Sequence, residues 1–453
     1  MNRPSRLQQD ALGLAQSVVM GVAGTAPPFS ISATMATLVG AVGILAPASL
    51  LYCGLMMFGI TFAYMHLNRV EANAGASYAW VSRIFNQTLG FFAGWTLLVS
   101  SALFMVSATL PAANATLLLI RPELVDNQLL VTAIAVGWLL AISAVVLRGI
   151  EITSAVQTAM TLIEIAILSC IMGLAAFKFG PQALHKLSWA SLSPMAFSPT
   201  SFASGAVIAL YFFWGWDVAV NLNEETRRSA HTPGLGAVVA MVIIMAAFIG
   251  FAAITLLALS DEEIRQSSTN IIFAVADKLL PRPWSYLAVL ALMLSTIGTL
   301  ETSILQFTRT QFAMARDGVM HERYARLHAR WKTPHVATLL IAGLGAALLL
   351  LSLFFRDVDA VLKASINAIG VQAAYYYGLA GFACAWHFRR QALKSAFALV
   401  MMVAWPALSA AALWIAAALT MRDFDAPTAI FGIGGILLGF IPLGLNRRAA
   451  RRG

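Results

Sequence analysis

One acidic side chain lies in the middle of an apolar segment, directly after a glycine and a tryptophan. Residues 205–233 begin as an apolar run, reach Trp214-Gly215-Trp216-Asp217, and end in a charged cluster. Glycine weakens a helix by about 1 kcal/mol relative to alanine, and an ionisable group in hydrocarbon is costly unless it faces protein or water. A broken helix that presents backbone groups and Asp217 to a small molecule explains both features. A kinked structural helix, with Asp217 hydrogen-bonded to a neighbour, is the alternative.

A second irregularity interrupts the first apolar run. Residues 20–28 read Met-Gly-Val-Ala-Gly-Thr-Ala-Pro-Pro, so Gly21, Gly24 and two prolines fall within one segment. Neither Pro27 nor Pro28 has the N–H that would continue the helix, and each ring clashes with the preceding turn. In lipid such a gap persists only where protein or a water-filled cavity satisfies the freed carbonyls. The pattern predicts a functional break here, with a kink that has no function as the alternative.

Two further carboxyl groups lie inside apolar runs. Glu164 is near the middle of residues 152–177, and Glu301 precedes Thr302 and Ser303. Burial in hydrocarbon favours the neutral form of a carboxyl, which suits a group that must load and unload a proton. Glu164 is therefore predicted to carry the coupling proton. A sodium site shared with Thr302 and Ser303, or a static hydrogen-bonded carboxyl, is the alternative, and Glu301 is either a second participant or an arginine's partner.

The composition places these residues in an integral membrane protein. Hydrophobic residues make up 60% of the chain and charged residues 11%, whereas soluble domains carry about 25% charged residues. The net charge of +9 is distributed as a signal of membrane orientation, so nucleic acid is not an expected partner. The three cysteines lie in apolar runs and the seven histidines lie in or near connections. The sequence therefore predicts no metal site, no cofactor and no enzyme active site.

Twelve apolar runs are long enough to cross a membrane. Short connections separate them, and no soluble domain is predicted. The expected fold class is an all-α integral membrane protein with twelve transmembrane helices. The runs are residues 12–40, 46–67, 88–119, 128–147, 152–177, 201–222, 234–259, 284–314, 335–355, 360–386, 397–420 and 427–445.

Basic residues in the connections predict the orientation. With the N-terminus placed in the cytoplasm, twenty of the 29 lysine and arginine residues fall on the inner side. By the positive-inside rule, both termini are cytoplasmic and the protein is a multi-pass component of the cytoplasmic (inner) membrane. The basic tail, residues 447–453, is first of all part of this signal.

The first and sixth runs are five spans apart, face opposite ways and are both interrupted near mid-depth. Paired interruptions at matching places in two halves indicate the binding site of a secondary transporter. They predict a five-plus-five inverted repeat with discontinuous helices 1 and 6. The predicted units are an N-terminal segment (1–11), a first repeat (12–180), a second repeat (201–390), helices 11 and 12 (395–446) and the tail (447–453).

Five short stretches carry a family likeness. Residues 73–78 (Asn-Ala-Gly-Ala-Ser-Tyr) and 89–95 (Leu-Gly-Phe-Phe-Ala-Gly-Trp) surround the entry to the third span, and Gly215-Trp216-Asp217 lies in the sixth. Residues 313–318 (Ala-Met-Ala-Arg-Asp-Gly) end the eighth span, and residues 330–334 (Arg-Trp-Lys-Thr-Pro) lead into the ninth. In this order they resemble the amino acid–polyamine–organocation superfamily of secondary transporters, in particular its branch of amino acid permeases and putrescine importers. The resemblance implies alternating access and uptake or exchange of amino acids or amines.

The two breaks are where a substrate is expected to bind. Free N–H groups from about Thr25 to Ser30 are expected to hold a carboxylate, and carbonyls before each break to hold an ammonium group. Aromatic side chains could close over a cation, or some of them could serve only in packing. The predicted substrate site comprises Gly21, Gly24, Thr25, Ala26, Pro27, Tyr211, Phe213, Trp214, Gly215, Trp216 and Asp217.

The resemblance also bears on coupling and gating. Proton-coupled relatives have a lysine near the position of Glu164, so a glutamate there reverses the sign of the charge. Asp217 resembles an acid that putrescine-importing relatives carry after a glycine and an aromatic residue. Glu224 and Glu225 are predicted to form an inner gate with Arg83 or Arg148, and a solvated charged loop is the alternative.

Taken together, these patterns predict a proton-coupled importer of amines or amino acids. A sodium-coupled or exchange-mode (antiport) amino acid permease is the alternative, and a sensor built on a transporter fold is a third possibility. The expected partners are a small-molecule substrate, H⁺ or Na⁺ and the lipid bilayer, with the protein a monomer or homodimer. An ion channel is disfavoured because no filter loop is visible.

Overall fold

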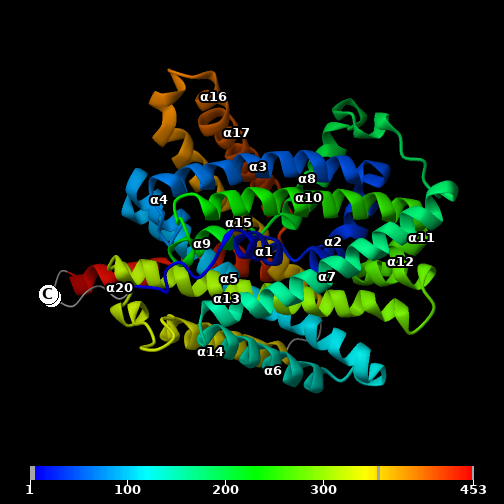
Figure 1. Cartoon of the computed structure of the whole chain (residues 1–453), viewed down its shortest axis with the longest axis horizontal. Coiled ribbons are helices and arrows are strands. Elements are labelled where there is room, and N and C mark those ends of the chain that lie inside the picture. Colours follow the sequence, from blue (N-terminus) through cyan, green and yellow to red (C-terminus); the bar gives the residue numbers. More distant parts are fainter. Residues whose placement is uncertain (1–5, 355–357, 451–453) are drawn as a thin grey trace.

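The computed structural model describes residues 6–354 and 358–450, and all regular secondary structure within them is helical, as predicted (Figure 1). The long helices run roughly along one direction, as in a membrane bundle. The α-helices are α1 (Leu14–Thr25), α2 (Pro27–Val42), α3 (Ala46–Val70), α4 (Ser77–Ile84), α5 (Gln87–Ile120), α6 (Gln128–Leu147), α7 (Ile150–Phe179), α8 (Pro199–Phe212), α9 (Val218–Asn221), α10 (Thr232–Ala258), α11 (Asp261–Ser267), α12 (Ile271–Leu279), α13 (Leu287–Arg316), α14 (His335–Ser352), α15 (Val358–Ala392), α16 (Ala396–Ala398), α17 (Trp405–Thr420), α18 (Ala426–Ala429), α19 (Gly435–Leu437) and α20 (Phe440–Ala450).

Nine stretches of the described residues are long and apolar enough to cross a membrane. One of them, Leu14–Val70, has 57 residues and contains α1, α2 and α3. The predicted sixth span (α8 with α9) and tenth span (α15) are not among the nine. The structure therefore confirms an all-α membrane protein, while the count of twelve spans stays a prediction.

Two helix breaks meet inside the bundle, at the places that the sequence indicated. Ala26, with φ 49°, separates α1 from α2, and Pro27 is the first residue of α2. Residues 213–217 separate α8 from α9, and Gly215 within them has φ 103°. A Cβ atom on Gly24 would collide with the Gly215 carbonyl, and a Cβ atom on Gly215 with the Gly24 carbonyl. The two breaks therefore touch through their backbones, and only glycine fits at either position.

The packing of the helices agrees with two related halves. α2 packs beside α8, and α1 beside α9. Helices five predicted spans apart also pair: α3 with α10, α5 with α13, and α6 with α14 (Figure 1). Such pairing is expected of inverted repeats, and the division into residues 12–180 and 201–390 stays a prediction. The predicted terminal segments lie partly outside the described residues, which omit 1–5 and 451–453 and the side chains of 447–450.

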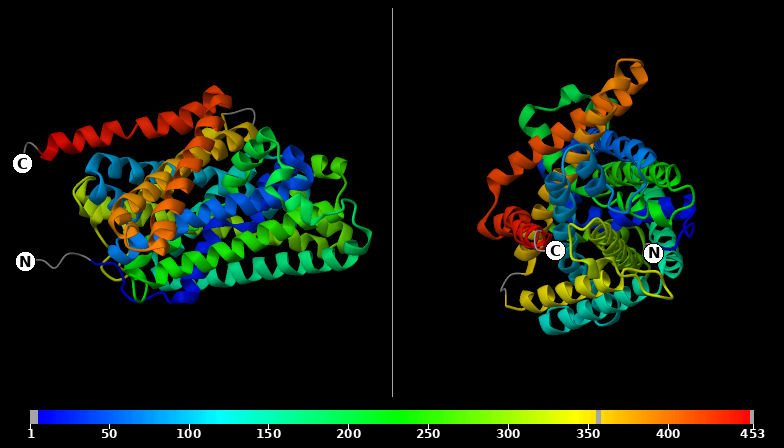
Figure 2. Two further views of the ribbon diagram at one scale, coloured as in Figure 1. Left: turned by 90° about the horizontal axis from the view of Figure 1, so that it is seen from above. Right: turned by 90° about the vertical axis from the view of Figure 1, so that its left-hand side faces the viewer.

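Both ends of the described chain lie at one end of the bundle (Figure 2). Leu7 packs there with Ala74 and Phe312, and the side-chain amide of Asn446 donates to the Val319 carbonyl at 2.7 Å. We call this end the N-terminal face. α11 and α12 lie at the other end, which we call the opposite face (Figure 1).

Candidate functional site

Asp217 is buried at the break between α8 and α9, directly before the first residue of α9. The Tyr377 hydroxyl donates to its Oδ1 at 2.7 Å, and Gln306 Nε2 donates to its Oδ2 at 2.7 Å. Tyr377 also accepts the Gly215 N–H at 3.2 Å. α13 and α15 thus hold the broken helix through the carboxylate. The Asp217 N–H and the Tyr376 side chain also interact with this carboxylate.

Aromatic side chains surround this carboxylate. Trp216 stacks on Tyr377 with ring centroids 5.5 Å apart and an interplanar angle of 12°. Trp214 donates its indole N–H to the Tyr376 hydroxyl at 2.9 Å and meets Phe104 edge-on at 5.0 Å. The result is a wall of rings whose π faces and hydroxyls line the broken segment.

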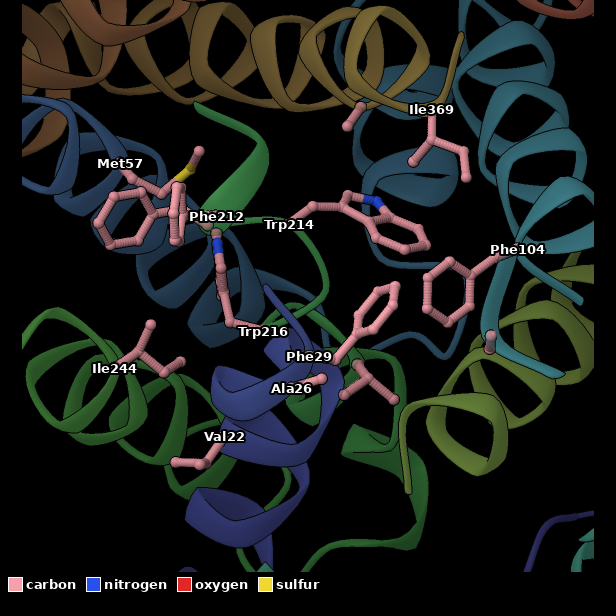
Figure 3. Packing of buried hydrophobic residues seen from close by; sticks show 14 of the residues in the cluster. Val22, Ala26, Phe29, Met57, Phe104, Phe212, Trp214, Trp216, Ile244 and Ile369 are labelled. Atoms are coloured by element: carbon pink, nitrogen blue, oxygen red, sulfur yellow. The ribbon is translucent and has the colours of Figure 1, made fainter. Parts of the chain in front are cut away.

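The three predicted aromatics do not act together. Trp214 points towards Phe104 and Phe29, which come from α5 and α2 (Figure 3). Phe213 instead packs against Phe248 of α10 at 5.5 Å, so it is placed as a packing residue. Trp216 is fully buried, and its indole nitrogen has no hydrogen-bond partner within the described chain.

The first turn of α2 does not offer the free N–H groups that the sequence suggested. Pro27 and Pro28 have no N–H, and both begin the helix. The Phe29 N–H donates to Ser295 Oγ at 3.3 Å, and the Ser30 N–H donates to the Ala26 carbonyl at 2.9 Å. The expectation of a carboxylate-binding turn is therefore not met, because proline and neighbouring acceptors remove every donor from it. The Ala26 N–H is likewise used, since it donates back into α1.

A cavity of about 370 Å³ lies between the breaks and the opposite face. It is lined by α2 and α8, which both run from a break to that face, and by α15 and α17. Tyr211 marks its inner end, and Thr34, Asn367 and Thr420 are polar groups on its wall. Its lining includes Tyr211, two residues before the break after α8, but not Trp214, Trp216 or Asp217.

The N-terminal face is closed by ion pairs. Arg309 makes two parallel hydrogen bonds of 2.8 Å to Glu225, and both side chains are at most 1% exposed. Arg316 makes two hydrogen bonds of 2.9 Å to Glu224, whose Oε1 also accepts the Ala74 N–H at 2.9 Å. These contacts fasten the loop after α9 to α13.

The expected gate partners were wrong. Arg83 pairs with Glu71 at 2.8 Å rather than with Glu224 or Glu225. No ion pair joins Arg148 to either glutamate within the described ranges. Arg83 lies on α4, beside the glutamate that follows α3, whereas α13 carries the guanidinium groups that face the loop after α9.

The N-terminal segment adds a second closure. The N–H groups of Ala11 and Leu12 donate to the Glu225 carbonyl at 2.9 and 3.0 Å, and the Arg227 N–H donates to the Leu12 carbonyl at 2.8 Å. The chain before α1 is therefore bound across the loop that carries Glu225.

Glu164 and Glu301 lie on facing helices, α7 and α13. Glu164 is buried, and the Ser295 side chain is the polar group beside its carboxyl. With the Gln157 amide oriented to satisfy both of its ends, its nitrogen donates to Glu301 Oε1 at 3.1 Å and its oxygen accepts from Thr161 at 3.0 Å. Gln157, Thr161 and Glu164 share one face of α7, so polar side chains line that face between the two carboxyls.

Thr302 and Ser303, the ligands of the alternative sodium site, lie on α13 next to Glu301. Thr302 Oγ1 donates to the Thr299 carbonyl at 3.0 Å, and the Thr299 hydroxyl donates to the Ala23 carbonyl at 2.8 Å. Thr302 and Ser303 are both buried. Across the described part of the chain, no group of three or more His, Cys, Asp or Glu side chains is arranged to hold a metal ion.

Comparison with known proteins decides the family. A family model described as "Amino acid permease" matches residues 9–441 of the chain. This chain belongs to the amino acid permease family. It is a membrane transporter and not an enzyme.

The relatives of this permease differ in what they carry. It is 24% identical over 430 residues to the low-affinity putrescine importer PlaP of Escherichia coli. The aligned region covers 89% of this chain and 88% of the relative. The permease is 25% identical to the serine/threonine exchanger SteT of Bacillus subtilis, over 68% of this chain and 67% of the relative. It is 23% identical to the human Asc-type amino acid transporter 1, over 69% and 60%.

Several residues of the permease's site were not found from the sequence. Gln306, Tyr376 and Tyr377 hold the broken helix 6, Gln157 reaches Glu301, and Arg309 neutralises Glu225. A buried arginine in the apolar run 284–314 was a usable signal, because it requires an acidic partner. The two tyrosines gave no such signal, since tyrosine is an ordinary residue of an apolar helix.

Proposed function

We propose that this permease imports organic amines, or amino acids with a cationic side chain, across the cytoplasmic membrane. The substrate's ammonium group binds at Asp217, between the two helix breaks. The N-terminal face is the cytoplasmic one, in keeping with the excess of basic residues on that side.

The observation that carries the substrate class is an imbalance of acceptors over donors at the breaks. Asp217 offers carboxylate oxygens as acceptors, whereas the turn that begins at Pro27 offers no free N–H. An ammonium group needs only acceptors, but the carboxylate of an amino acid needs donors. The indole rings of Trp214 and Trp216 add faces that attract a cation. A substrate that presents an amine to the breaks, with no carboxylate beside it, fits this arrangement.

The proposed coupling ion is a proton carried by Glu164. A buried carboxyl with a single hydroxyl beside it and no basic partner is stable when neutral and costly when charged. Gln157 and Thr161 provide a polar line from this carboxyl towards Glu301. A change in the protonation of Glu164 would change the hydrogen bonding of Ser295, which lies beside it. Because Ser295 Oγ accepts the Phe29 N–H of α2, the proton on Glu164 is coupled to the break in helix 1.

Alternating access is supported by the asymmetry between the two ends. The cavity of about 370 Å³ lies along α2 and α8, on the opposite-face side of the breaks, whereas the pairs formed by Glu224 and Glu225 close the N-terminal face. A substrate that enters from the opposite face and leaves at the N-terminal face is imported. Similarity to a putrescine importer over 89% of the chain supports this direction.

Uptake by the purified permease in proteoliposomes tests the substrate class. Labelled putrescine, arginine and serine are supplied under an inward proton gradient, and wild type is compared with Asp217→Asn. We expect accumulation of the cationic substrates only, and a loss of roughly ten- to hundredfold in uptake efficiency in the variant, as for one interaction with a charged group. Asp423→Asn, at an exposed acid, is the matched control. Equal uptake of serine by wild type, or unchanged putrescine uptake in Asp217→Asn, refutes the proposal.

A second comparison tests the coupling. Glu164→Gln keeps the shape of the side chain but cannot release a proton. We expect it to exchange substrate while failing to accumulate it under the gradient, with Glu123→Gln at an exposed carboxyl behaving as wild type. Gradient-driven accumulation in Glu164→Gln would place the proton elsewhere, and accumulation driven by sodium alone would replace the proton by Na⁺.

A further inference from the structure

A second cavity lies on the flank of the N-terminal face, between α3, α4 and α15. Its volume is about 270 Å³. Apolar and aromatic residues make up part of the wall, and Glu71, Arg83, His387 and Arg389 make up the polar part. It shares no lining residue with the cavity along α2 and α8, so entry of a substrate from the opposite face does not account for it.

The charges in this cavity are unbalanced. Arg83 is neutralised by Glu71 at 2.8 Å. Arg389 has no acidic partner among the described residues, and its guanidinium lies over the Trp386 ring at 4.1 Å. Glu71 is the one acidic residue in segments 66–86 and 384–398, which also carry Arg69, Arg390 and Lys394. The cavity therefore presents a positive charge that attracts an anion.

The rim of the cavity is apolar and exposed. Val70 is 46% exposed and Trp386 is 53% exposed. Both lie at the ends of helices that reach the N-terminal face, where tryptophan is typical of the boundary between hydrocarbon and water. A soluble anion would gain nothing from such a rim, whereas acyl chains would cover it. The Arg389 cation and the apolar rim together match an amphiphile with an anionic headgroup.

We propose that this cavity binds the headgroup of an anionic phospholipid from the leaflet at the N-terminal face. The phosphate lies at Arg389, and the acyl chains follow Val70 and Trp386 into the bilayer. Basic pockets between transmembrane helices are known to take such headgroups. A lipid bound there links α4 to α15, the helix that carries Tyr376 and Tyr377, and thereby stabilises the scaffold of the substrate site.

Thermal unfolding of the purified full-length permease in detergent tests the site. The added lipid is dioleoyl phosphatidylglycerol, with dioleoyl phosphatidylcholine and soluble glycerol phosphate as separate arms. The variants are Arg389→Gln and, as a matched control, Arg390→Gln, which removes the same charge from the next residue of the same helix but does not line the cavity. Retention of phosphatidylglycerol through native mass spectrometry is a second readout that does not depend on stability.

We expect phosphatidylglycerol, and not phosphatidylcholine, to raise the unfolding temperature of wild type and Arg390→Gln. In Arg389→Gln the lipid concentration needed should rise about fivefold, the effect of one basic residue at an anionic surface, and retention of the lipid should fall. An equal response of the two variants would show a diffuse charge effect and overturn the proposal. A response to glycerol phosphate equal to that of the lipid would overturn it as well, because the occupant would then be a soluble anion.

Discussion

The buried ion pair between Glu225 and Arg309 allows a quantitative test of the gate. Both side chains are at most 1% exposed and meet through two hydrogen bonds of 2.8 Å. Removing one partner of such a pair leaves the other charge buried, at a cost of about 3–5 kcal/mol. Opening the N-terminal face relieves this cost, because the pair joins α13 to the loop after α9. In Glu225→Gln the population open at that face should therefore increase by about a hundredfold or more.

The neighbouring pair provides the matched control. Glu224 and Arg316 are 21% and 31% exposed, and an exposed pair contributes only about 0–1 kcal/mol. Glu224→Gln should therefore change the open population less than about tenfold. The two variants remove the same charge from adjacent residues, so a difference between them reports burial and not net charge.

The assay is the labelling rate of a buried cysteine. Ala313 is fully buried one turn from Arg309 on α13, and Ala313→Cys is made after replacing Cys53, Cys170 and Cys384 by alanine. A membrane-impermeant maleimide is applied from the N-terminal face of oriented vesicles. Labelling should be about a hundredfold faster in Glu225→Gln and nearly unchanged in Glu224→Gln. Equal rates in the two variants would refute the assignment of the Glu225 pair as the closure.

Two further predictions concern backbone and pH. Gly215→Ala should abolish transport and lower the unfolding temperature. An alanine at φ 103° is strained by about 1–3 kcal/mol, and its Cβ would also meet the Gly24 carbonyl. Gly137→Ala is the control and should be neutral in the same thermal assay, because nothing lies within 4 Å of the added Cβ. On the opposite face, hydrogen bonds from the ammonium of Lys278 and from the Ser260 N–H lower the pKa of Glu263 from 4.5 to about 2. This pair's stabilisation is complete above pH 4.5 and is lost as the pH falls towards 2. The difference in unfolding temperature between wild type and Lys278→Met should therefore shrink over that range, and a constant difference would contradict it.

The fold was readable from the sequence because its main signals are local. Apolar runs indicated the helices, and the positions of glycine and proline indicated both breaks. In hydrocarbon a helix can be interrupted only where other groups hydrogen-bond to the freed backbone N–H and C=O groups. Asp217 was found for the same reason, as a charge that lipid does not accept. These inferences needed no knowledge of which helices touch.

The details of the site depended on contacts between distant segments. Tyr377 and Gln306 lie 160 and 89 residues from Asp217, and no local pattern joins them. Of the free N–H groups expected near Pro27, that of Phe29 was lost to Ser295, 266 residues away. Arg83 was assigned to the wrong glutamate because the charge pattern does not state which cation lies on the facing helix. Long-range pairing of this kind is decided by packing, which periodicity does not encode.

The contact between Gly24 and Gly215 has a consequence for how the chain can change over evolutionary time. A side chain at either glycine would meet the backbone carbonyl of the other, and no substitution at one position removes that carbonyl. A larger residue at one site becomes acceptable only after the two halves have separated there. Both positions are therefore expected to stay glycine across permeases that keep this approach, and a larger residue at either would mark a permease whose two breaks lie farther apart.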